Sequence, residues 1–305
     1  MMMSEETVRR LAADRPQVTG EIHTANNFYG HDQVLKKYCG HAPDYQLKAV
    51  VEHGVFLNDP VRYIWEADRQ APLPVFLAAS KAHADYVTET TDKVGIPVGP
   101  MIMYALPFVP EPQAHCAGRV LAVPVHSSHH VIANTDEEDF VRRIDSCGVP
   151  RSQVSVLLYW KDILLGHDSF YREKGFGVLT AGHIFSNGFL YLFAEIMQNH
   201  DLIVTNAVGT HVFYAALMQK PVWIVPGSTV FTTQGRPYCI YRSPVERRVR
   251  ELFGSLRDAL TDEQREYVNE LTGVASFRTP DRLRDLLDFA EFRHRGGAQR
   301  LRRSA

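Results

Sequence analysis

The chain of 305 residues lacks any apolar run near the length of about 20 residues that a membrane-spanning helix needs. Its first ten residues, MMMSEETVRR, lack the apolar core of a secretory signal peptide. A basic excess is missing too, since the net charge is -2 at pH 7, whereas nucleic-acid binders carry clustered Lys and Arg. These absences predict a cytoplasmic protein with no nucleic-acid partner and at most peripheral membrane contact.

Closely spaced cysteines and two common catalytic motifs are also absent. No CxxC pair occurs among Cys39, Cys116, Cys147 and Cys239, which predicts reduced thiols and excludes a disulfide framework. The HExxH pattern of helical zinc sites and the GxSxG nucleophile elbow do not occur. With 45% hydrophobic and 22% charged residues, the composition is that of a globular protein with one large domain or two smaller ones.

The second half of the chain contains a regular alternation of short apolar runs and helical patterns. The predicted strands are 119–125, 153–160, 176–180, 201–205 and 221–225, and the predicted helices between them are 136–147, 161–174, 187–200 and 208–219. Continuously apolar strands that alternate with helices are typical of parallel sheets covered on both faces. The pattern therefore predicts a doubly wound α/β domain.

The first half is less regular but of the same class. Apolar runs predict strands at 47–51, 73–79 and 94–98, and helices are predicted at 32–38 and 81–91. The Pro-rich segment 107–112 is interpreted as a linker. We therefore predict a smaller α/β domain at 1–112, a Rossmann-like domain at 113–290, and a frayed basic tail at 291–305.

Polar or small residues follow every predicted strand of the second half. Because the carboxyl ends of parallel strands share one edge, where ligands bind, these residues are predicted to line a common site. They are His126, Ser127, Ser128, His129 and His130 after the first strand, Lys161 after the second, His183 after the third, Asn206, Gly209, Thr210 and His211 after the fourth, and Gly227 and Ser228 after the fifth.

The HSSHH stretch at 126–130 allows three roles. Its histidines could bind zinc, but a neighbouring carboxylate and a helical register are missing. A serine could act as a nucleophile with a histidine base. We favour imidazoles and hydroxyls that bind a negatively charged ligand, with no metal. The TNAVGTH stretch at 205–211 places a helix start after a strand, which is either an anion site or an ordinary helix cap.

The first half has a candidate base. The strand at 47–51 runs into Glu52, His53 and Gly54, and a carboxylate and an imidazole at a strand end are suited to general-base catalysis. A second polar cluster lies upstream and is interpreted as either part of a site or a solvated loop; it comprises Glu21, His23, Asn26, Asn27, Tyr29 and His31.

These motifs resemble those of GT-B glycosyltransferases. More narrowly, they resemble bacterial capsule and surface-polysaccharide enzymes of the sialyltransferase and CDP-glycerol glycerophosphotransferase type. VEHG stands where those families carry their base motif, PVHSSHH where they carry a His-Pro motif, and TNAVGTH where a Ser/Thr motif holds the nucleotide. Here Ser127 replaces the proline after His126, and the base motif has one acid rather than two.

The resemblance implies two Rossmann-like domains with doubly wound parallel sheets facing a cleft. It also implies metal-independent sugar transfer from a CMP-, CDP- or UDP-linked donor to a glycan or lipid-linked acceptor, with no further cofactor. Glu52 or His53 would be the base, and His126 would stabilise the leaving phosphate. The donor would be bound by Ser127, Ser128, His130, Lys161, His183, Asn206, Gly209, Thr210 and His211. The alternatives are a non-hydrolysing sugar-nucleotide 2-epimerase and a non-catalytic polysaccharide-assembly protein.

Overall fold

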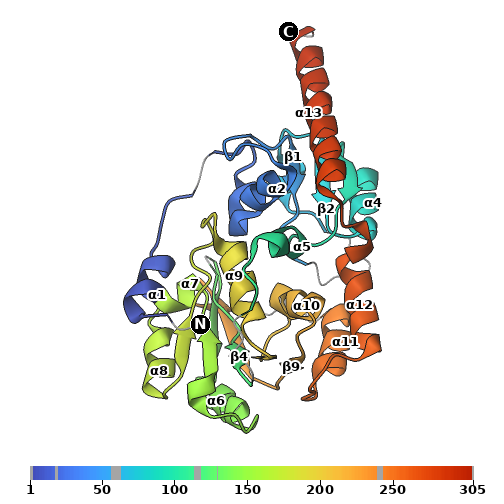
Figure 1. The fold of residues 1–305 in the computed structure, drawn as a ribbon. Helices are drawn as coiled ribbons and strands as arrows, with labels where there is room; N and C mark the ends of the chain where they lie inside the picture. The colour runs from blue at the N-terminus through green and yellow to red at the C-terminus, as the bar shows by residue number, and fades with distance from the viewer. Residues whose placement is uncertain are drawn as a thin grey trace. The chain divides into compact units, whose positions relative to one another are not determined.

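The computed structural model describes residues 3–17, 20–55, 63–112, 118–128, 130–238 and 243–303 (Figure 1). Its contacts divide the chain into two compact units. Unit 1 comprises Met1–Arg15, Val109–Ile184 and Tyr191–Val268, and unit 2 comprises Pro16–Phe108, Phe185–Leu190 and Asn269–Ala305. The division differs from the predicted domains, because the first residues join the second half of the chain and the last residues join the first half.

Unit 1 is built on a five-stranded parallel sheet in the order β7-β6-β4-β8-β9. Val120 pairs with Val154 on one side and with Leu202 on the other, which fixes the register of the three central strands. The strands are β4 (Val120–Val123), β6 (Val154–Leu157), β7 (Gly177–Leu179), β8 (Leu202–Thr205) and β9 (Val222–Ile224). The predicted α/β class and the parallel sheet of the second half are confirmed.

The strand order of unit 1 reverses between β4 and β8. From β4 the chain adds β6 and then β7 on one side, and it then returns to add β8 and β9 on the other side. In open α/β sheets the connections on the two sides of such a reversal diverge and leave a crevice at the carboxyl ends of the two strands. A ligand site is therefore expected at the loops that follow β4 and β8.

The helices of unit 1 are capped and amphipathic. In α6 (Glu137–Asp145), the Asp136 side chain accepts from the Asp139 N–H, and the apolar residues of the helix are buried. The helix predicted at 161–174 is two helices, α7 (Trp160–Leu164) and α8 (His167–Glu173), because Gly166 at φ 88° breaks it. The others are α9 (Phe189–Gln198), α10 (Thr210–Leu217), α11 (Pro244–Phe253) and α12 (Asp262–Thr272).

Helix α1 (Glu5–Ala12), which the sequence analysis did not predict, belongs to unit 1. Ser4 caps it by accepting from the Thr7 N–H, and Val8 and Ala12 are buried. In its last turn, the carbonyl of Leu11 accepts from the His183 N–H at 3.1 Å. The chain start is therefore attached to the loop that follows β7.

A small antiparallel sheet completes unit 1. It has the order β11-β10-β5 and comprises β5 (Ile132–Thr135), β10 (Thr229–Thr233) and β11 (Arg236–Tyr238). Ala133 pairs with Phe231, so this sheet joins the segment after β4 to the segment after β9. The sequence analysis missed these strands because they are polar and half-exposed rather than continuously apolar.

Unit 2 has a three-stranded parallel sheet of β1 (Ala49–Val51), β2 (Val75–Ala78) and β3 (Val94–Pro97) in that order. The predicted doubly wound arrangement is wrong for the described part of this unit, because its strand order does not reverse. Its helical elements are the 3-10 helices η1 (Thr24–Gly30), η2 (Leu106–Phe108) and η4 (Val274–Ser276) and the α-helices α2 (His31–Cys39), α3 (Glu66–Gln70), α4 (Lys81–Thr90), α5 (Ile102–Ala105) and α13 (Pro280–Arg303).

The structure bears on three further predictions, which concern the C-terminal tail, the cysteines and membrane-spanning helices. The predicted frayed tail at 291–305 is wrong for residues 291–303, which continue α13. Cys39 and Cys147 carry free thiols, whereas Cys116 and Cys239 lie outside the described residues. No helix in the described ranges has both the length and the apolar character needed to cross a membrane.

A glycine lets α4 pack on the sheet of unit 2. A Cβ atom on Gly95 of β3 would lie 2.0 Å from the backbone oxygen of Ala84 in α4. We expect Gly95→Ala to lower the free energy of unfolding by about 3 kcal/mol, because helix and strand must separate to admit the methyl group. Urea unfolding measures this. Gly188→Ala is the control, since nothing lies within 4 Å of that position; equal stability of the two variants would contradict the packing argument.

Candidate functional site

The loops after β4 and β8 are joined by one buried side chain, that of Asn206. Its Oδ1 accepts from the backbone N–H of Val125 at 2.7 Å, and its Nδ2 donates to Oγ1 of Thr135 at 3.1 Å. The amide thereby connects β8, the end of β4 and β5. Asn206, predicted to bind the donor, has its side-chain groups in contact with protein and acts here as a positioning residue.

Two histidines lie where these loops meet. His126 is exposed, and its Nδ1 donates to the carbonyl of Ser127 at 2.9 Å, which orients Nε2 away from the backbone. His211 lies in the first turn of α10, with Nε2 at 3.0 Å from Oγ1 of Thr205. Burial, together with the charge of His126, lowers the pKa of His211 to about 3. His211 is therefore neutral at pH 7, and His126 is the solvent-facing member of the pair.

The N-terminus of α10 begins at this edge. Its N-cap residue, Gly209, is extended at φ -162° and has no side chain that could cap the helix. A Cβ atom there would lie 3.1 Å from Nδ1 of His211. The helix dipole and the first-turn N–H groups make such an end attractive to an anion. The structure thus brings together His126, predicted to stabilise the leaving phosphate, and three of the predicted donor-binding residues, Gly209, Thr210 and His211.

The remaining described residues of the HSSHH stretch shape the loop. Ser127 is fully buried; its N–H donates to the Asp162 carboxylate at 3.0 Å, and its Oγ accepts from the N–H of Ala133 at 3.1 Å. Oγ of Ser128 accepts from the N–H groups of His130 and Val131, as in a tight turn. The two serines therefore hold the backbone, and the exposed side chains are those of His126 and His130.

Lys161 and His183 both lie beside Trp160. Lys161 is half-buried, with Nζ at 5.6 Å from the centre of a Trp160 ring. His183 is fully buried, with its ring 4.0 Å from that of Trp160 and its Nε2 at 3.4 Å from the Asp14 carboxylate. The resemblance implied a ligand-facing His183, whereas the structure places it in the interior of unit 1 next to the segment after α1.

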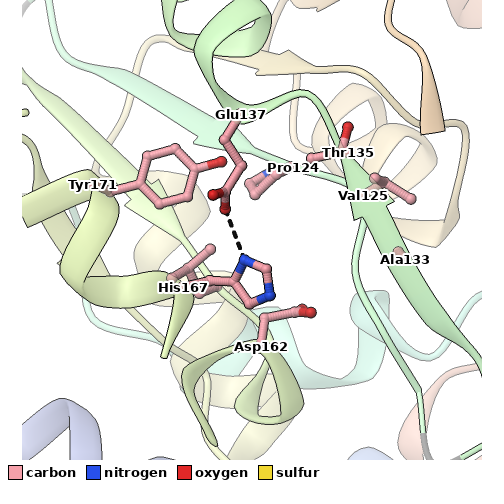
Figure 2. Close-up of a pocket in the computed structure, with 9 residues that line it drawn as sticks. Pro124, Val125, Ala133, Thr135, Glu137, Asp162, His167 and Tyr171 are labelled. Atoms are coloured by element: carbon pink, nitrogen blue, oxygen red, sulfur yellow. Dashed lines mark hydrogen bonds and ion pairs between the residues drawn. The ribbon is translucent and has the colours of Figure 1, made fainter. Parts of the chain in front are cut away.

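A small pocket lies behind the loop that follows β4 (Figure 2). Figure 2 shows Glu137 bound to His167, with Oε1 at 2.8 Å from Nδ1. The hydrogen bond that His167 donates to Glu137 raises the pKa of His167, and burial raises the pKa of Asp162. The lining residues are Pro124, Val125, Ala133, Thr135, Glu137, Leu158, Asp162, His167 and Tyr171.

None of the predicted site residues lines this pocket. Glu137 lies in the first turn of α6, where acidic residues are common, and no sequence motif distinguishes His167. Their pairing depends on how α6 and α8 pack, and no local motif encodes it. Asp162 shows the same difficulty, because its bond to the backbone of Ser127 joins residues that are 35 positions apart in the sequence.

The alternative of a zinc site in the HSSHH stretch finds no support among the residues described. Within those ranges no three His, Cys, Asp or Glu side chains are grouped as metal ligands. His129, one of the three histidines considered, lies outside the described residues.

In unit 2, Glu52 is a tightly held residue at the end of β1. It is buried, and its Oε2 accepts from the N–H of Ala79 at 2.7 Å and lies 2.9 Å from Nδ1 of His83. Burial alone would lower the pKa of His83, but the hydrogen bond and charge of Glu52 outweigh it, so the pKa is raised. The carboxylate therefore connects β1 to β2 and α4.

His53, the next residue, has the opposite character. Its ring lies edge-on between Trp65, at 4.1 Å, and Phe28, at 5.3 Å. Both ring nitrogens are buried, and neither has a hydrogen-bond partner in the described structure. Burial lowers the pKa of His53. Of the two predicted bases, His53 is thus the one with an uncommitted lone pair.

Comparison with known proteins adds no relative. No protein-family model and no curated protein matches the chain. The resemblance to GT-B glycosyltransferases therefore stays a prediction that rests on the quoted motifs.

The unfolding free energies of two variants test the contrast between His53 and His83. We expect His53→Phe to leave the unfolding free energy unchanged or to raise it by up to about 2 kcal/mol, because it replaces two unpaired buried nitrogens by apolar atoms. His83→Phe is the matched control and should cost about 3 kcal/mol, because it leaves the Glu52 carboxylate buried without its partner. Chemical denaturation measures both; an equal loss in the two variants would show that His53 is bonded.

The burial of His31 should make the free energy of unfolding depend on pH. Burial, together with the charge of His53, lowers its pKa to about 3, so the unfolded chain binds a proton more readily than the folded one. The stability that neutral His31 contributes is complete above its unfolded pKa and is lost as the pH falls. When the pH falls from 7.5 to 5.5, the unfolding free energy of the wild type should therefore decrease by about 1.4 kcal/mol more than that of His31→Gln. Parallel pH profiles of the two proteins would refute this.

Proposed function

We propose that the protein is a glycosyltransferase that moves a sugar from a nucleotide-sugar donor to a hydroxyl of a surface-polysaccharide or glycan acceptor. The observation that carries the proposal is the reversal of strand order between β4 and β8, with His126 and His211 beside the start of α10. Unit 1 would bind the donor there, and its pyrophosphate or phosphate would lie against the α10 N-terminus.

The proposed donor contacts use groups that the structure exposes at this edge of the sheet. The first N–H groups of α10 point out of the helix start, and Gly209 allows a close approach of the phosphate. His126 is exposed, and its Nδ1 donates to the Ser127 carbonyl, so Nε2 would donate to the phosphate in the imidazolium form of the ring. Asn206 and Asp162 would not touch the donor; they fix the loop that carries His126 through their bonds to Val125 and Ser127.

The reaction consists of one substitution at the anomeric carbon. The acceptor oxygen forms a bond to that carbon while the bond to the phosphate oxygen breaks. Negative charge then develops on the departing phosphate, and positioned donors and a helix dipole stabilise it, namely His126 and α10. This donor set supplies the stabilisation that a metal ion gives in other enzymes, so the proposed transfer is metal-independent.

The acceptor proton needs a base, and we assign this role to His53 of unit 2. Glu52 accepts two bonds that hold β1, β2 and α4 together, whereas His53 carries a lone pair on an unpaired imidazole. Its lowered pKa keeps the ring neutral at pH 7, which is the form that accepts a proton.

The direct test is a binding and turnover screen with CMP, CDP, UDP, GDP and their sugars. We expect one nucleotide to bind and its sugar to be transferred when a glycan acceptor is added. In that reaction, His126→Ala should lower kcat/KM by about 100-fold with no change in the unfolding midpoint, because it removes a donor to the leaving phosphate. His294→Ala on α13 is the control and should keep full activity.

Three results would contradict this function. Release of free sugar and nucleotide without any acceptor would indicate an epimerase-type reaction. Absence of binding by every nucleotide would indicate a non-catalytic protein. Wild-type turnover by His126→Ala would remove the leaving-group role of the loop after β4.

A further inference from the structure

The first half of helix α13 packs against unit 2. Leu283, Leu287 and Ala290 are buried at the spacing of one helix face, and the helix contacts α2 and β1. Tyr45 holds the end of this stretch, because its hydroxyl donates to the carboxylate of Glu291 at 3.0 Å. Figure 1 shows the following turns of α13 extending beyond the other labelled elements of unit 2. The packed part of the helix therefore ends near Glu291.

The next residue has the most exposed large apolar side chain in the described part of the chain. Phe292 is 74% exposed, and Phe289, three residues earlier, is 39% exposed. Residues three apart are neighbours on a helix surface, so the two rings form one apolar strip. At 3.6 residues per turn, Phe292 lies on the opposite side of the helix from Leu283 and Leu287. Adjacent exposed rings on the unpacked side of a helix are typical of an interaction surface.

The charge of α13 changes sign at the same position. Residues 280–291 contain four acidic residues and two arginines, whereas residues 292–303 contain five arginines and no acidic residue. Arg293 and Arg295 are exposed, and Arg295 forms an ion pair with Glu291 of the preceding turn. The helix dipole favours positive charge near a helix C-terminus, but it does not account for an exposed phenylalanine there. The surface thus combines apolar rings with positive charge.

The projecting part of α13 is a weak helix by itself. Gly296 and Gly297 follow each other in its interior, and glycine is the least favourable helix residue after proline. Packing does not require glycine at the first of these positions, because a Cβ atom on Gly296 would have nothing within 4 Å. Most helices in proteins are stabilised by contacts along an amphipathic face. A partner that covers the strip of Phe289 and Phe292 would supply such contacts.

An anionic lipid bilayer fits this surface better than a nucleic acid or a second copy of the chain. Helices that bind membrane surfaces carry phenylalanine on one face and Lys or Arg beside it, and anionic headgroups attract the basic residues. A nucleic-acid backbone would pair with the arginines and leave the rings of Phe289 and Phe292 in water. A symmetric contact between two copies through this strip would bring the two Arg293 side chains together, where like charges repel.

We propose that residues 289–303 of α13 bind the surface of a membrane that contains anionic lipids. The rings of Phe289 and Phe292 enter the region between headgroups and acyl chains, and Arg293 contacts lipid phosphates. The positive charge of residues 300–303 adds to the attraction. The inference goes beyond the proposed function and does not depend on it.

The test is sedimentation of the full chain with two kinds of vesicle, one of pure phosphatidylcholine and one of phosphatidylcholine with one third phosphatidylglycerol. We expect binding to the second kind only. Raising NaCl from about 0.1 M to about 1 M should weaken it, because the screening length falls from about 10 Å to about 3 Å. Phe292→Ser should weaken binding about tenfold and Arg293→Gln about fivefold. Both side chains are exposed, so neither change should move the unfolding midpoint.

Two control variants separate this surface from ordinary surface changes. Arg282→Gln removes an exposed arginine from the packed half of α13, and Leu256→Ser removes an exposed apolar side chain from unit 1. Both should bind vesicles as the wild type does. The inference is wrong if the chain binds neither vesicle, if it binds both equally, or if Phe292→Ser binds as the wild type. A dimer in light scattering that Phe292→Ser converts to a monomer would also overturn it, because a second copy would then cover the strip.

Discussion

The parallel pairing of β4 with β8 is the constraint on which the proposed donor site depends. It places two loops, separated by about 80 residues of sequence, at one edge of the sheet, and it does so at the point where the strand order reverses. The amide of Asn206 then fixes the loops to each other through Val125 and Thr135. Without this pairing, His126 and His211 would be two unrelated histidines, and the start of α10 an ordinary helix end.

Polar residues at this edge divide into those that hold the loops and those that remain for a ligand. Ser127 and Asn206 are buried and have protein partners, while His126 is exposed and oriented by its own backbone. A ligand site needs both kinds, because an imidazole on an unsupported loop would lose conformational freedom on binding and weaken the interaction. The same division occurs in unit 2, where Glu52 holds the sheet and its neighbour His53 has unpaired nitrogens.

Much of the fold of unit 1 could be predicted from the sequence, because its strands are buried on both faces and are therefore continuously apolar. The polar strands β5 and β10, which pair with each other in the small antiparallel sheet, carry no such pattern, so they were missed. For the site, the position of each loop along the chain predicted that His126, Gly209, Thr210 and His211 would share an edge. The burial of His183 could not be predicted, because whether its ring faces a ligand or Trp160 depends on how residues 11–14 pack against the loop after β7.

The unpaired imidazoles have a consequence for the energetics of unit 2. Each buried nitrogen without a partner costs about 1–3 kcal/mol relative to its hydrated state, and the hydrophobic packing of residues such as Val50, Phe76 and Val87 must offset that cost.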